Sequence, residues 1–204
     1  MISSGKKFTF ILLPMLIIIL AGTIVLVVMH AMTREKISEN RRIARLHILD
    51  TVMPLPYNNS LYDDVIRIEN SGISDGTQPL DVFRARHDEK PLGIVIMPVK
   101  AKGYSGNIEL IIGIDIDGTV LAVRTLKHSE SRGLGDQIDY KKSGWIRLFR
   151  SLSLGNPPVS DWAVTADGGK IDQISGATIT SRGVVTAVRK SLEFYRANRD
   201  TLYQ

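Results

Sequence analysis

The chemically most suggestive residues form one short run near the C-terminal end, Asp172-Gln173-Ile174-Ser175-Gly176-Ala177-Thr178. The small residues at 175–177 would let a bulky group approach the backbone closely, and Thr178 offers a hydroxyl just ahead of an expected helix start. Because helix N-termini attract anions, the run is compatible with a covalently attached group whose phosphate lies at Thr178. The same residue types also build ordinary loops and N-caps, so spacing alone leaves both interpretations open.

The elements around this run must place Thr178 beside a folded core. Thr180 or Ser181 is the expected N-cap of an amphipathic helix that runs to about Tyr195, and its apolar stripe has helical spacing: Val184, Val185, Val188 and Leu192. A short helix is also expected over residues 140–150, where Trp145 and Phe149 would share one face.

A series of short runs rich in Val and Ile precedes these helices. Separated by turn residues, they predict an antiparallel meander over 65–68, 80–87, 93–100, 108–115 and 119–126. Asp117-Gly118 is a strong hairpin signal, whereas a calcium loop at Asp115 and Asp117 lacks the full EF-hand spacing. The expected fold class is α+β, with one domain built on a mainly antiparallel sheet with flanking helices.

Residues 8–29 carry no formal charge and are dominated by Ile, Leu, Val and Met. As a helix they would cross a hydrocarbon core of about 30 Å, so they predict an uncleaved membrane anchor. A cleavable signal peptide is the alternative, but the apolar run exceeds about 15 residues and no Ala-x-Ala site follows. Thr33 is the expected cap of a second helix that runs to about Thr51 and stops before the prolines of 53–56.

Composition argues against several classes of protein. The net charge is +5, but the 26 Lys and Arg residues are scattered and no nucleic-acid motif is present. The absence of cysteine excludes disulfides, thiolate metal sites and iron–sulfur ligation by this chain. The four histidines are not accompanied by a Gly-x-Ser-x-Gly or HExxH pattern, which disfavours a hydrolase, and no metal site or catalytic residue is expected.

Four blocks together resemble one known family. Asp-x-x-Ser-Gly-Ala-Thr at 172–178 is similar to the signature on which a flavin transferase places FMN, through a phosphoester bond to the final Thr. The other blocks are 103–106, 128–136 and 162–169, and their order after an N-terminal anchor resembles the G subunit of the bacterial Rnf (Rsx) electron transport complex. The C subunit of the sodium-translocating NADH:quinone reductase is the related alternative, although it is usually longer.

The resemblance implies a flavin-carrying subunit that relays electrons through one covalent FMN in a membrane complex coupled to ion translocation, without being an independent catalyst. Thr178 would carry the FMN. The transferase would recognise the residues that shape the attachment loop, Asp172, Ser175, Gly176 and Ala177. Thr180 would lie near the phosphate. The candidates for ring contacts are Glu130, Gly133, Leu134 and Gly135. A non-redox, membrane-anchored scaffolding protein is the competing hypothesis.

The chain departs from the family pattern at one point, and its orientation in the membrane is implied by the resemblance and not by the charge count. Ser131-Arg132 stands where the family usually has Thr-Pro, which frees φ at 132 and adds a cation that could favour reduced flavin or simply face solvent. A Lys/Arg count across the anchor would place the domain in the cytoplasm, whereas the resemblance implies a single-pass protein of the bacterial inner membrane with a periplasmic domain. Expected partners are the other Rnf subunits, an ApbE-like flavin transferase and the lipid bilayer, with no nucleic acid. The expected domain boundaries are 1–7, 8–29 for the anchor, 30–56 for a connecting helix, and 57–204 for the FMN-binding domain.

Overall fold

The computed structural model describes residues 4–69, 72–73 and 79–203. They divide into two units, Met1–Arg45 and Leu46–Gln204. Helix α1 (Ser4–Asp50) is one continuous helix, and its segment Pro14–Arg34, of mean hydropathy 2.6, is long and apolar enough to cross a membrane. The predicted cap at Thr33 is therefore wrong. The Thr33 hydroxyl donates to the Met29 carbonyl at 2.7 Å, the bond of a residue inside a helix rather than at its start.

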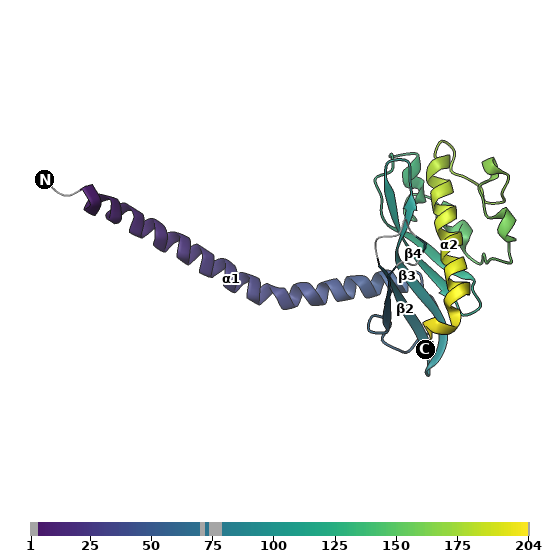
Figure 1. Ribbon diagram of the computed structural model, residues 1–204, viewed down its shortest axis with the longest axis horizontal. Coiled ribbons are helices and arrows are strands. Elements are labelled where there is room, and N and C mark those ends of the chain that lie inside the picture. Colours follow the sequence, from purple (N-terminus) through teal and green to yellow (C-terminus); the bar gives the residue numbers. More distant parts are fainter. Residues whose placement is uncertain (1–3, 70–71, 74–78, 204) are drawn as a thin grey trace. The chain divides into compact units, whose positions relative to one another are not determined.

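The Leu46–Gln204 unit is built on a five-stranded antiparallel meander, as predicted (Figure 1). Its strands follow the chain order, β1 (Val65–Ile68), β2 (Leu80–His87), β3 (Lys90–Lys102), β4 (Asn107–Asp115) and β5 (Val120–Lys127). Strand β3 is longer than predicted. It pairs with β2 from His87↔Lys90 to Asp81↔Met97 and, among the described residues, continues beyond β2 while still paired with β4.

The β4–β5 connection is the hairpin that Asp117-Gly118 predicts. Asp115 donates its N–H to the Thr119 carbonyl at 2.9 Å, and its Oδ1 accepts the N–H groups of Asp117 and Thr119 at 3.0 and 2.7 Å. Gly118 supplies the left-handed conformation, with φ of +85°. The Asp115 carboxylate therefore stabilises a turn, and the described residues contain no group of three acidic or His side chains arranged to hold a metal ion.

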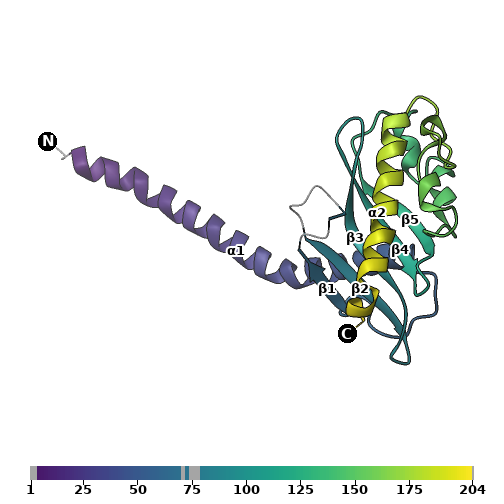
Figure 2. The ribbon, with the colours of Figure 1, turned by 45° about the vertical axis from the view of Figure 1, so that its right-hand side comes forward.

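Apolar layers cover both faces of the sheet. Helix α2 (Thr178–Leu202) lies along one face (Figure 2), and the four residues of its predicted stripe are buried there. Each such side chain contributes about 1.5–3 kcal/mol through removal from water. The other face is covered by Leu49, Val52, Met53 and Leu61, which pack in one cluster with Phe83, Val95 and Ile111.

Helix α2 is longer than predicted and lies very close to β3. It continues past Tyr195 to Leu202 because its last turns are also packed, with Leu202 2% exposed and the Tyr195 hydroxyl donating to the Ile116 carbonyl at 2.9 Å. At its other end Gly183 lies against β3, where an added Cβ would be 2.0 Å from the Lys102 carbonyl oxygen. Only glycine permits this approach of helix and strand.

The helix predicted over 140–150 is only a 3-10 helix, η2 (Trp145–Phe149). The Ser143 hydroxyl accepts the Trp145 N–H at 3.0 Å, and this local bond starts the turn without a preceding α-helical segment. The shared face is confirmed, since the Trp145 and Phe149 rings meet edge to face with centroids 5.4 Å apart. Further 3-10 helices are η1 (Gly135–Ile138), η3 (Val159–Asp161) and η4 (Thr165–Asp167).

Candidate functional site

Helix α2 begins at Thr178 itself, so its N-cap position lies three to four residues before the predicted cap. Ala177 occupies the N-cap position, so no side chain caps this helix, and the capping role expected of Thr180 or Ser181 is wrong. Both hydroxyls form other hydrogen bonds instead, local ones for Ser181 and a tertiary one for Thr180. Ser181 Oγ accepts the Ile174 N–H and donates to the Ala177 carbonyl, each at 3.0 Å, and Thr180 Oγ1 donates to Glu130. Since the first N–H groups of an α-helix have no intrahelical partners, those of the first turn remain directed toward the N-terminal end.

The loop before Thr178 is fixed by backbone contacts. The Asp172 carbonyl accepts the indole N–H of Trp145 at 2.7 Å, and the Ala177 N–H donates to the Ile174 carbonyl at 3.0 Å. Gly176 has φ of +76°, and a Cβ there would be 3.0 Å from Leu134 Cδ2. Glycine at 176 therefore permits both the turn and the close approach of the Gly133-Leu134-Gly135 segment.

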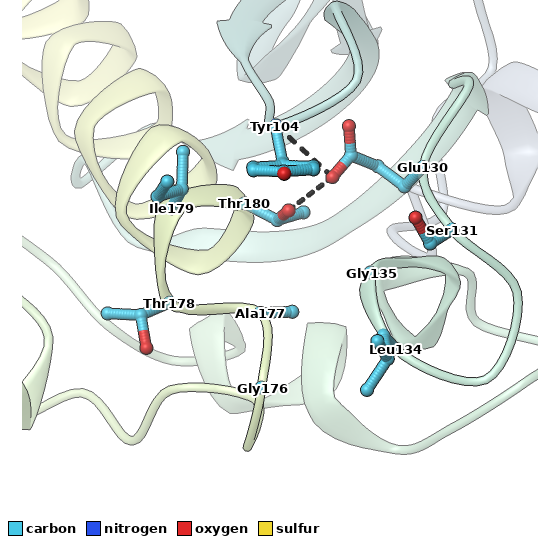
Figure 3. Close-up of a pocket in the computed structure, with 10 residues that line it drawn as sticks. All are labelled: Tyr104, Glu130, Ser131, Leu134, Gly135, Gly176, Ala177, Thr178, Ile179 and Thr180. Carbon is cyan, nitrogen blue, oxygen red and sulfur yellow. Dashed lines mark hydrogen bonds between the residues drawn. The ribbon is translucent and has the colours of Figure 1, made fainter.

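Glu130 joins three segments of the site (Figure 3). Its side chain is only 7% exposed, and its two carboxylate oxygens accept the N–H groups of Tyr104 at 3.2 Å and Ser105 at 2.9 Å as well as the Thr180 hydroxyl. Gly103 and Gly135 pack so closely on it that a Cβ at either position would lie within 3.0 Å of a Glu130 side-chain atom. Glu130 thus connects the β3–β4 loop, the 131–135 segment and the first turn of α2.

A cavity of about 480 Å³ opens where these segments meet. It is lined by Tyr104, Glu130, Ser131, Leu134, Gly135, Gly176, Ala177, Thr178, Ile179 and Thr180. Figure 3 shows Thr178 at the first turn of α2, with its hydroxyl directed away from the Glu130–Thr180 pair. The cavity combines a hydroxyl, a helix start and apolar side chains in one place.

The cavity brings together most of the site residues predicted from the sequence: Glu130, Leu134, Gly135, Gly176, Ala177, Thr178 and Thr180. Asp172, Ser175 and Gly133 do not line it, although they belong to the segments that do. Three lining residues were not among the candidates: Tyr104, Ser131 and Ile179. Tyr104 is 72% exposed, and the sequence signal that could have identified it is an aromatic residue in a short segment bounded by Gly103 and Gly106.

An exposed ion pair ties the start of α2 to the preceding loop. Arg182 donates from Nε and Nη2 to the two carboxylate oxygens of Asp167 in η4, at 2.6 and 2.7 Å. Hydrogen bonding to Arg182 holds the pKa of Asp167 below its usual range.

Arg132, which stands where the family usually has Pro, is exposed and is not among the residues that line the cavity.

The fold and the site define a domain of the FMN-binding class. Residues 103–193 match the family model described as FMN-binding domain, and this range contains every residue that lines the cavity.

Several relatives share most of the chain. It is 37% identical over 194 residues to the G subunit of the ion-translocating oxidoreductase complex from Pseudoalteromonas atlantica, covering 95% of this chain and 89% of the relative. It is 34% identical over 203 residues to the G subunit from Aliivibrio fischeri, covering 99% of this chain and 95% of the relative. It is 36% identical over 174 residues to the G subunit from Vibrio cholerae, covering 85% of this chain and 83% of the relative. The chain therefore belongs to the family of G subunits of ion-translocating oxidoreductase complexes, the family that its motifs predict.

The residues of the cavity fit FMN. Its volume lies within the range of about 300–1,000 Å³ of small-molecule sites, and its lining combines apolar and aromatic side chains with a few polar groups. Gly135 and Gly176, which allow Glu130 and Leu134 to approach the backbone, are part of the lining. The helix start at Thr178 provides N–H groups and a dipole suited to a phosphate.

Proposed function

We propose that this chain is a flavin-carrying, membrane-anchored subunit that relays electrons in an ion-translocating oxidoreductase complex, with one FMN attached to Thr178. The observation that carries the proposal is the position of Thr178, the first residue of α2, on a cavity of suitable size. Family membership supports the assignment, since the relatives are G subunits of such complexes. Coupling to ion movement would belong to the complex as a whole.

Attachment replaces the Oγ–H bond of Thr178 by an Oγ–P bond. With FAD as donor, the phosphoanhydride bond breaks, AMP leaves, and the hydroxyl proton passes to a base. A threonine hydroxyl is a weak nucleophile that needs such a base. Glu130 lines the same cavity, but its oxygens already accept three hydrogen bonds, which supports activation by a separate, ApbE-like flavin transferase.

After attachment, the chain's own residues would hold the cofactor in place. The N–H groups at the start of α2 would bind the phosphate, while Tyr104, Leu134 and Ile179 offer apolar contacts. The bound flavin would supply the redox chemistry, and the protein would set its position and the polarity around it. Asp172 and Ser175 lie outside the cavity, so we assign them to recognition by the transferase.

The apolar segment of α1 would anchor the chain once in the bacterial inner membrane. In this proposal residues 8–29 form the anchor, 30–56 the connector and 57–204 the FMN-binding domain. The domain lies on the periplasmic side, and the other subunits of the complex are its partners. A periplasmic reporter enzyme fused after Gln204 tests the orientation. Activity of a cytoplasmic reporter at the same position would contradict it.

Denaturing electrophoresis of the full chain, co-expressed with its flavin transferase, tests the attachment. In-gel flavin fluorescence is expected for the natural chain and should be lost in Thr178→Val. Thr186→Val is the matched control, because it removes a hydroxyl from the same helix two turns later, where the Thr186 hydroxyl donates to the Arg182 carbonyl and does not line the flavin cavity. Fluorescence retained in Thr178→Val, or absent from the natural chain with active transferase, would refute the proposal.

A further inference from the structure

A second cavity, of about 240 Å³, shares no residue with the first. Its lining is divided by chemistry. Thr51, Pro54, Leu121, Ala122, Val123 and Ile146 supply a largely apolar wall, while Arg124, Arg147, Arg150 and Tyr140 supply the polar groups. All of these residues belong to the Leu46–Gln204 unit, so the cavity lies within one folded body.

Two of the arginines stack on one aromatic ring. The guanidinium carbon of Arg124, on β5, lies 4.0 Å from the centroid of the Tyr140 ring, and that of Arg147, in η2, lies 4.6 Å from it. Arg124 also donates from Nη1 to the Val123 carbonyl at 2.8 Å. Arg150, the C-cap residue that follows η2, lines the same cavity. These contacts orient two of the three guanidinium groups before any ligand binds.

The charges around this cavity are not balanced by the protein. Within the part of the chain that the structure describes, no carboxylate lines the cavity and none of the three arginines pairs with one. Burial is the main cause that lowers the pKa of Arg124, and the charges of Arg147 and Arg150 lower it further, while Tyr140 opposes the shift. Arg147 and Arg150 are exposed, so solvent screens part of the repulsion among these three like charges, and a bound anion would relieve the rest.

We propose that Arg124, Arg147 and Arg150 form a binding site for a phosphate group, separate from the flavin cavity. Guanidinium groups present forked donors that match phosphate oxygens bidentately, and stacking on Tyr140 reduces the freedom that binding would remove. Such a phosphate could come from solution or from the headgroup of an anionic phospholipid. The apolar wall would suit the first part of an acyl chain and is not needed for a free phosphate.

The test uses the full chain and has two arms. In the first, isothermal titration calorimetry follows binding of inorganic phosphate to the chain in uncharged detergent, against chloride at equal ionic strength. In the second, the chain is reconstituted in phosphatidylcholine vesicles with or without phosphatidylglycerol, and its thermal unfolding midpoint is compared. Saturable phosphate binding identifies a free anion as the ligand, whereas a higher midpoint only with phosphatidylglycerol identifies the lipid headgroup.

Variants separate the site from general charge effects. Arg147→Gln with Arg150→Gln should weaken phosphate binding at least tenfold, or abolish the response to phosphatidylglycerol. Arg196→Gln with Arg199→Gln removes the same charge from exposed positions on α2 and should leave both responses unchanged. If the first pair fails to fold, Arg150→Gln alone should reduce the same response. Absence of a response in both arms, or equal losses in the two charge-matched pairs, would overturn the proposal.

Discussion

Replacing Glu130 by alanine should loosen the site without touching its apolar core. The Thr180 hydroxyl, 1% exposed, would stay buried without its acceptor, at a cost of about 1–3 kcal/mol. The N–H groups of Tyr104 and Ser105 belong to exposed residues and can bond to water, so each loss costs about 0.5–1.5 kcal/mol. Together the three lost hydrogen bonds should lower the free energy of unfolding by about 4 kcal/mol. Glu130→Gln keeps one acceptor oxygen, which can serve two of the donors, but its NH2 group would face the third donor. A loss of about 1–2 kcal/mol in the free energy of unfolding is therefore expected.

Urea unfolding of the full chain in uncharged detergent measures this loss of unfolding free energy. Both tryptophans, Trp145 and Trp162, lie in the domain, so their fluorescence reports its unfolding. Covalent flavin fluorescence should fall in Glu130→Ala, since the first turn of α2 loses its tie to the Tyr104 loop. Glu69→Ala, at an exposed position, is the control and should stay within about 0.5 kcal/mol of the natural chain. An equally small change in Glu130→Ala would show that the carboxylate does not hold the site together.

Two further predictions concern the start of α2. Gly183→Ala would bring a Cβ to 2.0 Å from the Lys102 carbonyl oxygen, so α2 must shift, and a loss of about 1–3 kcal/mol is expected in the same urea assay. Gly144→Ala is the control, since a Cβ there meets no atom within 4 Å, and an equal loss in both would refute the explanation. The lowered pKa of Asp167 means that its pairing with Arg182 stabilises the fold above the ordinary carboxyl pKa of about 3.9, and that this contribution is lost as pH falls through the lower folded pKa. Arg182→Gln should return the Asp167 pKa to its usual range in a carboxyl NMR titration, and an unchanged pKa would contradict the assignment.

The strands could be predicted because their evidence is local. Val- and Ile-rich runs between turn residues mark every strand of the meander, and Asp117-Gly118 marks its last hairpin. The apolar stripe of α2 was equally readable, since burial against a sheet requires that spacing.

Tertiary partners explain what the sequence did not reveal. Thr180 and Ser181 have the residue types of N-caps, but the Thr180 hydroxyl bonds to the distant Glu130 and that of Ser181 to the 174–177 turn, while the helix starts earlier, at Thr178. Glu130 is recognisable as part of a motif, yet its three donors come from segments 25 to 50 residues away. No local pattern encodes such distances, and only the fold brings these groups together.

The docking of α2 has a consequence for how the chain behaves during folding. An apolar helix face and the apolar sheet face that it covers can associate with other chains as long as they are exposed. Here the backbone of α2 lies against the Lys102 carbonyl through Gly183, and the apolar stripe of α2 is buried on the sheet. The helix that begins at Thr178 therefore also covers apolar surface that would otherwise be open to other copies of the chain. A chain whose α2 has not yet docked would be the form most prone to aggregate, before any cofactor is attached.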